Sequence, residues 1–179
     1  QIFEPAQKIY SARKKFLKTF IPFFVKSYSS ISDDAEIPQL MYSSHLSDNK
    51  MSEILKMQLP KDRILERTSR GVHKDDLQLS LGDFETKQYG SQGQIKTFVI
   101  ALKLAAYQYL KSSVKSKPIL LLDDIFEKID GGRAARLLQM LRGDEYGQIF
   151  ITDTEKKRVH SALKGVKPSK TDLILTNSD

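Results

Sequence analysis

Two neighbouring carboxylates, Asp123 and Asp124, directly follow a short run of aliphatic residues at positions 119–122. Such a run is typical of a central parallel strand that is buried on both faces, and the carboxyl ends of these strands are where open α/β sheets bind ligands. An ionised carboxylate beside apolar packing is costly unless a cation or hydrogen bonds compensate it. The acid pair therefore predicts a magnesium site completed by phosphate oxygens. The alternative is that both acids only end the strand and cap a turn.

A second candidate site is the polar turn Gly-Ser-Gln-Gly-Gln at residues 90–94. Apolar residues at helical spacing follow from Ile95 onward, so a helix is predicted to begin directly after this turn. The first amide groups of a helix lack internal partners and carry partial positive charge. Because Gly93 allows close approach of the backbone, the turn suits an anion such as phosphate. The alternative is that Ser91 simply caps the helix.

The elements that would position these residues alternate between helix and strand after residue 101. Asp130 is expected to cap a helix that carries Leu137, Leu138 and Leu141 and ends at Gly143. Further elements are expected as a strand at 148–152, a helix at 155–163 and a strand at 172–176. This alternation predicts a parallel sheet.

The residues before the polar turn are predicted to form helices together with a strand and an antiparallel β-hairpin. An amphipathic helix is expected at 3–20, ended or kinked by Pro22, with a polar connection at 29–34. A short helix is expected at 51–59, with Ser47 or Asp48 as its cap and Pro60 as its stop. The remaining predicted elements are a strand at 37–42, an alternating strand at 77–81 and its hairpin partner at 84–89.

Composition excludes several classes of protein. The 179 residues are 40% hydrophobic and 28% charged, which is typical of a globular protein with a real core. No apolar run approaches membrane-spanning length, and we expect no signal peptide. Cysteine is absent, which excludes disulfides and thiolate metal sites, and the three histidines lack metal-ligand spacing.

The net charge of +7 favours a polyanionic partner. It is concentrated in two regions of the sequence, and each is either a phosphate-contacting surface or a solvated face. The first region contains Lys8, Arg13, Lys14, Lys15, Lys18 and Lys26. The second contains Lys156, Lys157, Arg158, Lys164, Lys167 and Lys170.

Taken together, several segments resemble the RecF family of bacterial DNA replication and repair proteins, whose heads are similar to those of SMC-type ATPases. The segments are 71–77, 89–94, 101–105, 120–126 and 148–152. The resemblance implies an α/β fold: a fragment of an ABC-type ATPase head, with a signature helix and a mostly parallel Walker B sheet. Residues 1–60 would form the end of a helical and mixed appendage (lobe II). Residues 61–179 would form the C-terminal part of the head.

The resemblance also implies roles for individual residues. The signature motif, which contacts the γ-phosphate of ATP bound to the opposing subunit, would comprise Ser91, Gln92, Gly93 and Gln94. Asp123 corresponds to the Walker B magnesium ligand, and Asp124 to the acid that orients or activates the attacking water. Asp130 falls at the D-loop of the dimer interface, and Thr152 and Asp153 stand where transporter-type relatives carry a switch-loop histidine.

Two departures from the family pattern matter. Val72 replaces a usual proline, and no G-x-x-x-x-G-K-[ST] phosphate loop occurs in the 179 residues. The chain therefore resembles the C-terminal portion of such a protein, and we expect it to be inactive as an ATPase on its own.

The resemblance implies a cytoplasmic, ATP- and Mg²⁺-dependent protein of recombinational repair, replication and the SOS response, with weak DNA-dependent ATPase activity at full length. It would form an ATP-dependent homodimer on DNA gaps or single-strand/double-strand junctions, and work with recombination mediators such as RecR. Two alternatives remain at this point. One is the ATPase subunit of a transporter, and the other is a non-catalytic nucleic-acid-binding module with a degenerate ATPase fold.

Overall fold

The computed structural model describes residues 2–86, 90–114 and 116–154. The elements in this part of the chain are α1 (Phe3–Ser32), β1 (Pro38–Ser43), α2 (Met51–Leu65), the 3₁₀ turn η1 (Val72–Lys74), β2 (Asp76–Leu81), β3 (Phe84–Glu85), α4 (Gln92–Ser113), β4 (Leu120–Leu122), α5 (Gly131–Leu141) and β5 (Ile149–Ile151). The helix expected at 155–163 and the strand expected at 172–176 lie outside the described residues. None of the described helices has both the length and the apolar character of a membrane span.

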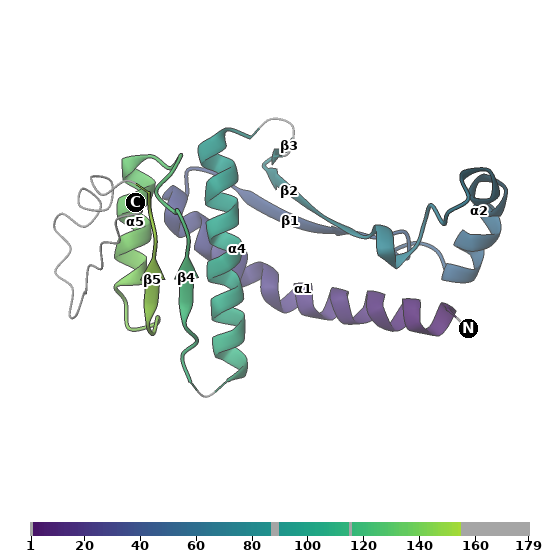
Figure 1. The fold of residues 1–179 in the computed structure, drawn as a ribbon, viewed down its shortest axis with the longest axis horizontal. Helices are drawn as coiled ribbons and strands as arrows, with labels where there is room; N and C mark the ends of the chain where they lie inside the picture. Colours follow the sequence, from purple (N-terminus) through teal and green to yellow (C-terminus); the bar gives the residue numbers. More distant parts are fainter. Residues whose placement is uncertain (1, 87–89, 115, 155–179) are drawn as a thin grey trace, which may run out of the picture.

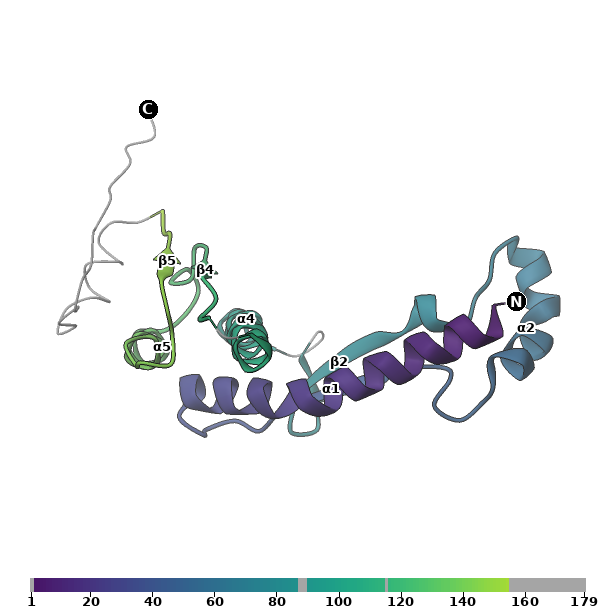
Figure 2. The same ribbon diagram turned by 90° about the horizontal axis from the view of Figure 1, so that it is seen from below.

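The long helix α1 connects two ends of the molecule (Figure 1). Its C-terminal half packs against α4 and α5, whereas its N-terminal half extends toward α2 and η1. Figure 2, seen from below, shows the same arrangement, with α2 at the far end from α5 and β5. A helix of 30 residues spans about 45 Å at about 1.5 Å per residue. α1 therefore spans most of the distance between the two ends.

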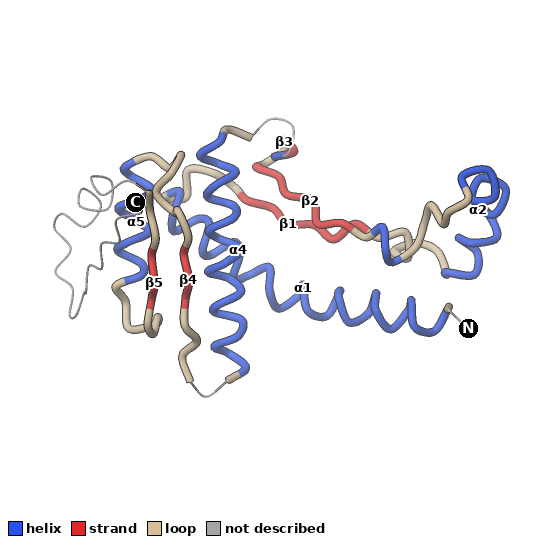
Figure 3. The backbone as a smooth tube through the Cα atoms, viewed as in Figure 1, coloured by secondary structure: helices blue, strands red, loops and turns tan. Residues whose placement is uncertain are grey.

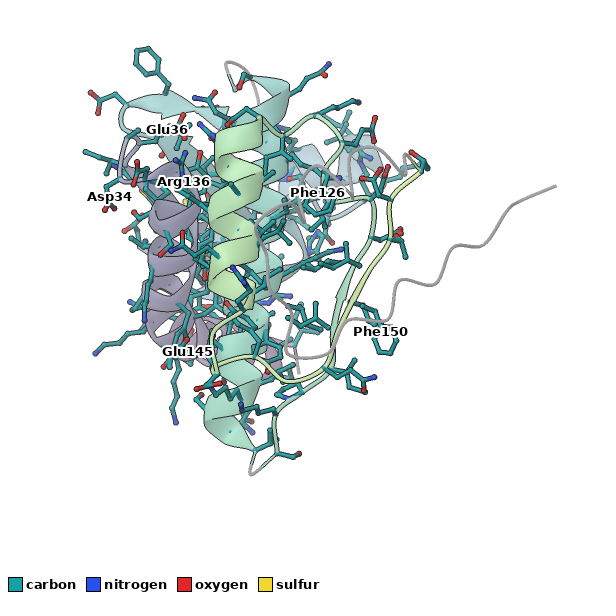
Figure 4. The ribbon with its side chains drawn as sticks, turned by 90° about the vertical axis from the view of Figure 1, so that its left-hand side faces the viewer. Asp34, Glu36, Phe126, Arg136, Glu145 and Phe150 are labelled. Carbon is teal, nitrogen blue, oxygen red and sulfur yellow. The ribbon has the colours of Figure 1, made fainter. Side chains whose placement is uncertain are left out.

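The described strands form two separate sheets (Figure 3). β4 and β5 are parallel, with Leu121 opposite Phe150, as the alternation of helices and strands predicts. β1, β2 and β3 form an antiparallel sheet. The expectation that residues 119–122 are buried on both faces is wrong for this chain, because Leu121 is 65% exposed while its neighbours Leu120 and Leu122 are buried. Figure 4 shows Phe150 on the side of these strands that faces away from α5.

Two hydrophobic clusters hold the helices in place. The first lies between α4, α5 and β4 and includes the fully buried Leu104, Leu122 and Leu137. The second joins α1 to α4 through Phe24, Tyr28 and Phe98, whose rings lie 4.6–6.3 Å apart. The second cluster contains residues from both sides of residue 60. The division of the chain into domains at that residue stays a prediction.

The expectation that Pro22 ends the first helix is wrong. α1 continues through Pro22 to Ser32 and ends at Asp33, which adopts a left-handed conformation. Pro22 is exposed, whereas Phe20 and Phe24 on either side of it are buried. Burial of this aromatic stripe outweighs the hydrogen bond that proline cannot donate. The polar connection expected at 29–34 is accordingly shorter than predicted.

We expect Pro22→Ala to raise the free energy of unfolding by about 1–2 kcal/mol. Alanine restores an amide donor within the helix, and this gain is partly offset because proline restricts the unfolded chain. Chemical denaturation monitored by circular dichroism measures the change, with Lys26→Ala on the same helix as the control. A loss of stability in Pro22→Ala would contradict this account of α1.

Two other boundaries also differ from the expectations. α2 continues through Pro60 to Leu65, and it begins after Lys50, so neither Ser47 nor Asp48 caps it. The second hairpin strand is shorter than predicted, because β3 covers only Phe84–Glu85 and residues 87–89 lie outside the described part of the chain.

Candidate functional site

Asp123 and Asp124 lie at the carboxyl end of β4, where the next strand, β5, also ends. The Thr152 hydroxyl donates a hydrogen bond to Oδ1 of Asp123. The amide of Asp124 donates to the backbone oxygen of Thr152 at 3.0 Å and to its Oγ1 at 3.2 Å. The structure therefore brings together three of the residues singled out in the sequence, and it does so through the register of the parallel strand pair.

Asp124 has a specialised conformation and environment. Its φ of 51° lies in the left-handed region, which aspartate tolerates better than most residues. Its Oδ1 is buried and has no hydrogen-bond partner among the described residues, an arrangement that costs about 1–3 kcal/mol in a folded protein. An oxygen of this kind fits a site that receives a cation or a polar ligand.

The described residues contain no cluster of three or more His, Cys, Asp or Glu side chains that could hold a metal ion. A magnesium ion at Asp123 would therefore need oxygen ligands in addition to the carboxylates of the described residues. This agrees with the way magnesium is usually held, by one or two carboxylates together with substrate phosphates and water.

The polar turn at 90–94 forms a capping box. The amide of Gln94 donates to the Ser91 hydroxyl at 3.2 Å, and the amide of Ser91 donates to Oε1 of Gln94 at 2.8 Å. Ser91 thus caps α4, as the alternative interpretation of this turn predicts. Ser91 and Gln92 are both exposed, so capping leaves them accessible to a ligand.

Gly93 lies against the loop that precedes α5. A Cβ atom at Gly93 would lie 3.2 Å from the backbone oxygen of Lys128, and Lys128 itself has a φ of 61°. The glycine therefore allows this close approach, because a Cβ atom here would make a tighter contact than most real Cβ atoms do. This contact places the first turn of α4 beside the loop that leads to Asp130.

Glu36, which the sequence did not single out, is the centre of a hydrogen-bond network. Its Oε1 accepts hydrogen bonds from Nε2 of Gln94 at 2.7 Å and from the Arg133 guanidinium at 2.9 Å, and its Oε2 accepts from the Tyr28 hydroxyl at 2.6 Å. Figure 4 shows Glu36 beside one end of α5. Burial raises the pKa of Glu36, but the hydrogen bonds from Tyr28, Gln94 and Arg133 outweigh it and leave the pKa below its usual value.

Arg133 extends this network to the start of α5 and back to the polar turn. Its Nε lies 3.1 Å from Oδ2 of Asp130, and its Nη1 donates to the Thr97 hydroxyl at 3.0 Å. Thr97 in turn donates to the backbone oxygen of Gly93 at 2.7 Å. Asp130 also caps α5 as predicted, because its Oδ1 accepts from the amide of Arg133 at 2.9 Å.

The predicted site residues thus fall into two hydrogen-bonded groups. The first comprises Asp123, Asp124 and Thr152 at the ends of the parallel strands. The second, at the first turns of α4 and α5, comprises Ser91, Gly93, Gln94 and Asp130, with Gln92 beside them. Of the two residues that sequence reasoning missed, Arg133 had a local signal, since it lies three positions after Asp130 on a helix. Glu36 had none.

The motif at 71–76 has a structural role that the sequence did not reveal. The Asp75 side chain is only 3% exposed, and it accepts hydrogen bonds from Arg13 at 2.7 Å and from the Tyr42 hydroxyl. Arg13 also donates to the backbone oxygen of Val72 at 2.7 Å. We call this the Arg13–Asp75 clasp, and it ties α1 to β1 and η1.

Comparison with known proteins shows extensive sequence similarity, although no family model matches the chain. The DNA replication and repair protein RecF of Bacteroides thetaiotaomicron is 44% identical over 158 residues, which are 88% of this chain and 43% of that protein. RecF of Flavobacterium johnsoniae is 43% identical over 164 residues, covering 92% of this chain and 46% of that protein. These relatives confirm the resemblance to the RecF family. The chain spans less than half the length of the curated relatives that it matches.

Solved structures confirm the predicted fold class. The recombination mediator protein RecF of the RecFOR pathway, in its structure with ATP, superposes with a TM-score of 0.65 at 24% identity, over 86% of this chain and 43% of that one. A second structure of that protein, RecF-ATPrS, gives a TM-score of 0.63 at 23% identity, over 83% of this chain and 42% of that one. The chain thus has the fold of part of RecF.

Proposed function

We propose that this chain, as a RecF-type sequence, is the C-terminal part of an ATP-dependent DNA-binding protein of recombinational repair and replication in the cytoplasm. The proposal extends to recombination mediators such as RecR as partners. Its support is the similarity to curated RecF proteins, whose names describe replication and repair, and to a RecF structure described as bound to ATP.

The acid pair is proposed to serve the phosphate end of bound ATP. Asp123, held by the Thr152 hydroxyl, is the proposed ligand of Mg²⁺, and the magnesium nucleotide would supply the phosphoanhydride bond that is hydrolysed. Asp124 is proposed to orient the attacking water or accept its proton through Oδ1, which has no hydrogen-bond partner among the described residues. The single observation that carries this proposal is the contact of Asp123 and Asp124 with Thr152 at the ends of β4 and β5.

The polar turn and the start of α5 are proposed to face ATP on a second subunit. Ser91 and Gln92 are exposed at the first turn of α4, where the helix dipole favours phosphate. Asp130 is exposed beside them. This proposal makes the protein an ATP-dependent homodimer in which the two groups of site residues serve different nucleotides.

The proposed function is tested with the full-length protein. We expect ATP and Mg²⁺ to promote dimerisation, measured by analytical ultracentrifugation, and to increase affinity for gapped DNA over blunt duplex, measured by fluorescence anisotropy. A protein that neither dimerises nor gains affinity for gapped DNA with ATP would contradict the proposal.

DNA contact is proposed at the end of the molecule that is opposite α5. We call residues 2–20 and 44–75, which include the N-terminal half of α1, α2 and η1, the basic arm (Figure 1). The arm contains twelve Lys and Arg residues and six Asp and Glu residues, so it carries most of the net charge of +7. An excess of cations on an extended surface favours binding to phosphates.

The lysines of α1 are better candidates for phosphate contacts than Arg13, which the clasp occupies. Lys14 and Lys15 are exposed, and we expect Lys14→Ala/Lys15→Ala to lower the salt slope of DNA binding by roughly one to two units, with a similar loss of affinity across DNA sequences. A salt titration by fluorescence anisotropy measures both quantities. Lys26→Ala/Lys103→Ala, which removes exposed lysines outside the arm, should change neither. An unchanged slope in the arm variant would show that these lysines are only a solvated face.

A further inference from the structure

Glu36 and Arg133 connect the two segments of this chain that, in the proposed function, face ATP on a second subunit. Glu36 contacts Gln94 in the polar turn, and Arg133 contacts Asp130 at the start of α5. The two side chains form an ion pair of 2.9 Å, with only 16% and 15% of their surfaces exposed. The polar turn and the start of α5 are thus joined through a largely buried pair.

Each member of the Glu36–Arg133 ion pair also contacts side chains other than its partner in the pair. Arg133 divides its guanidinium between Glu36, Asp130 and the Thr97 hydroxyl. Tyr28 donates to the remaining oxygen of Glu36, which anchors the pair to α1. A planar guanidinium with several fixed donors holds its partners in a defined geometry, which a flexible ammonium group would not.

Arg136 is a neighbouring arginine that attaches α5 to α1, and it serves as a comparison for Arg133. Arg136, one turn further along α5, donates to the backbone oxygen of Ile31 at 2.9 Å and lies 3.7 Å from Asp33. It therefore ties α5 to the end of α1 without contacting the polar turn. Arg133 differs from Arg136 because it contacts Asp130 at the start of α5. It also contacts Thr97, whose hydroxyl donates to the backbone oxygen of Gly93 in the polar turn.

We propose that Glu36 and Arg133 are positioning residues that hold the polar turn and the start of α5 as one preformed surface for the second subunit and its ATP. This inference rests on the proposed function. The pair acts through Gln94 and Asp130 and does not itself contact nucleotide. Gln94, whose amide group is shared between Ser91 and Glu36, is a part of the same support.

The test compares Arg133→Gln with Arg136→Gln in the full-length protein. We expect Arg133→Gln to weaken ATP-dependent dimerisation about tenfold, because the two segments no longer form one surface. ATP binding to the monomer should stay within about twofold of wild type, since monomer binding does not use this surface. Arg136→Gln should leave both quantities near wild type. Sedimentation equilibrium and fluorescent-nucleotide titration measure them.

Glu36→Gln is a second variant, which keeps the size of the side chain and removes its charge. It should weaken dimerisation in the same way, and Arg133→Lys should recover only part of the loss. Equal effects of Arg133→Gln and Arg136→Gln, or no effect of Arg133→Gln and Glu36→Gln on a wild type that dimerises, would overturn the inference alone. A wild type that stays monomeric with ATP would overturn the proposed function as well.

Discussion

ATP hydrolysis by the full-length protein is expected to slow about 10²–10⁴-fold when Asp124 is replaced by Asn, which is the usual contribution of a general base or a water-positioning acid. Asparagine preserves the size of the side chain and its ability to adopt a left-handed conformation. The backbone amide that contacts Thr152 is also unchanged. The substitution therefore removes the carboxylate while leaving the local fold in place.

Single-turnover hydrolysis with saturating Mg²⁺ and ATP separates this effect from binding. Nucleotide affinity and ATP-dependent dimerisation of Asp124→Asn should stay close to wild type. Asp83→Asn, which alters an exposed acid in the turn between β2 and β3, serves as the control. A hydrolysis rate for Asp124→Asn equal to that of wild type would remove Asp124 from the proposed mechanism.

The sequence predicts the acid-bearing half of the molecule well because its signals are local and agree with one another. Ser91 and Asp130 are strong capping residues, and each caps a helix as expected. The apolar runs before Asp123 and Thr152 form parallel strands in register. Capping, helical spacing and short apolar runs all depend on neighbours within a few positions, so they are visible without the fold.

The prolines show where local rules fail. The local rules predict that Pro22 ends or kinks its helix and that Pro60 ends its own, yet α1 and α2 continue through them. A proline costs a helix one hydrogen bond, and tertiary packing of flanking residues can exceed that cost. Phe20 and Phe24 provide that packing in α1. The extent of their burial depends on α4, which follows about seventy residues later.

The Glu36 network could not be predicted for a different reason. Glu36 lies 58 positions from Gln94 and 97 from Arg133, and it belongs to a loop with no motif of its own. A single charged residue between a helix and a strand is most often solvent-exposed. Only the packing of α1 against α4 and α5 brings these three side chains together.

The Arg13–Asp75 clasp is expected to contribute about 2–3 kcal/mol to the free energy of unfolding, so Asp75→Ala should destabilise the protein by that amount. The carboxylate is almost fully buried, and its removal leaves the Tyr42 hydroxyl without the acceptor that it now uses. Chemical denaturation measures the loss, with Asp48→Ala, an exposed acid in the basic arm, as the control. If the clasp acts as a unit, Arg13→Met and Asp75→Ala combined should cost at least about 0.5–1 kcal/mol less than the sum of the single variants.

The pH dependence of this difference identifies the ionised carboxylate as its source. Burial raises the pKa of Asp75, but the hydrogen bonds from Tyr42, Ser44 and Arg13 outweigh it and leave the pKa below its usual value. The stability that the carboxylate provides is therefore complete above the pKa of the unfolded chain, about 3.9, and is lost as the pH falls through the lower folded value. The difference between wild type and Asp75→Ala should be constant from pH 7 to about pH 5 and should shrink below about pH 4. A difference that persists unchanged in acid would show that Asp75 acts through packing alone.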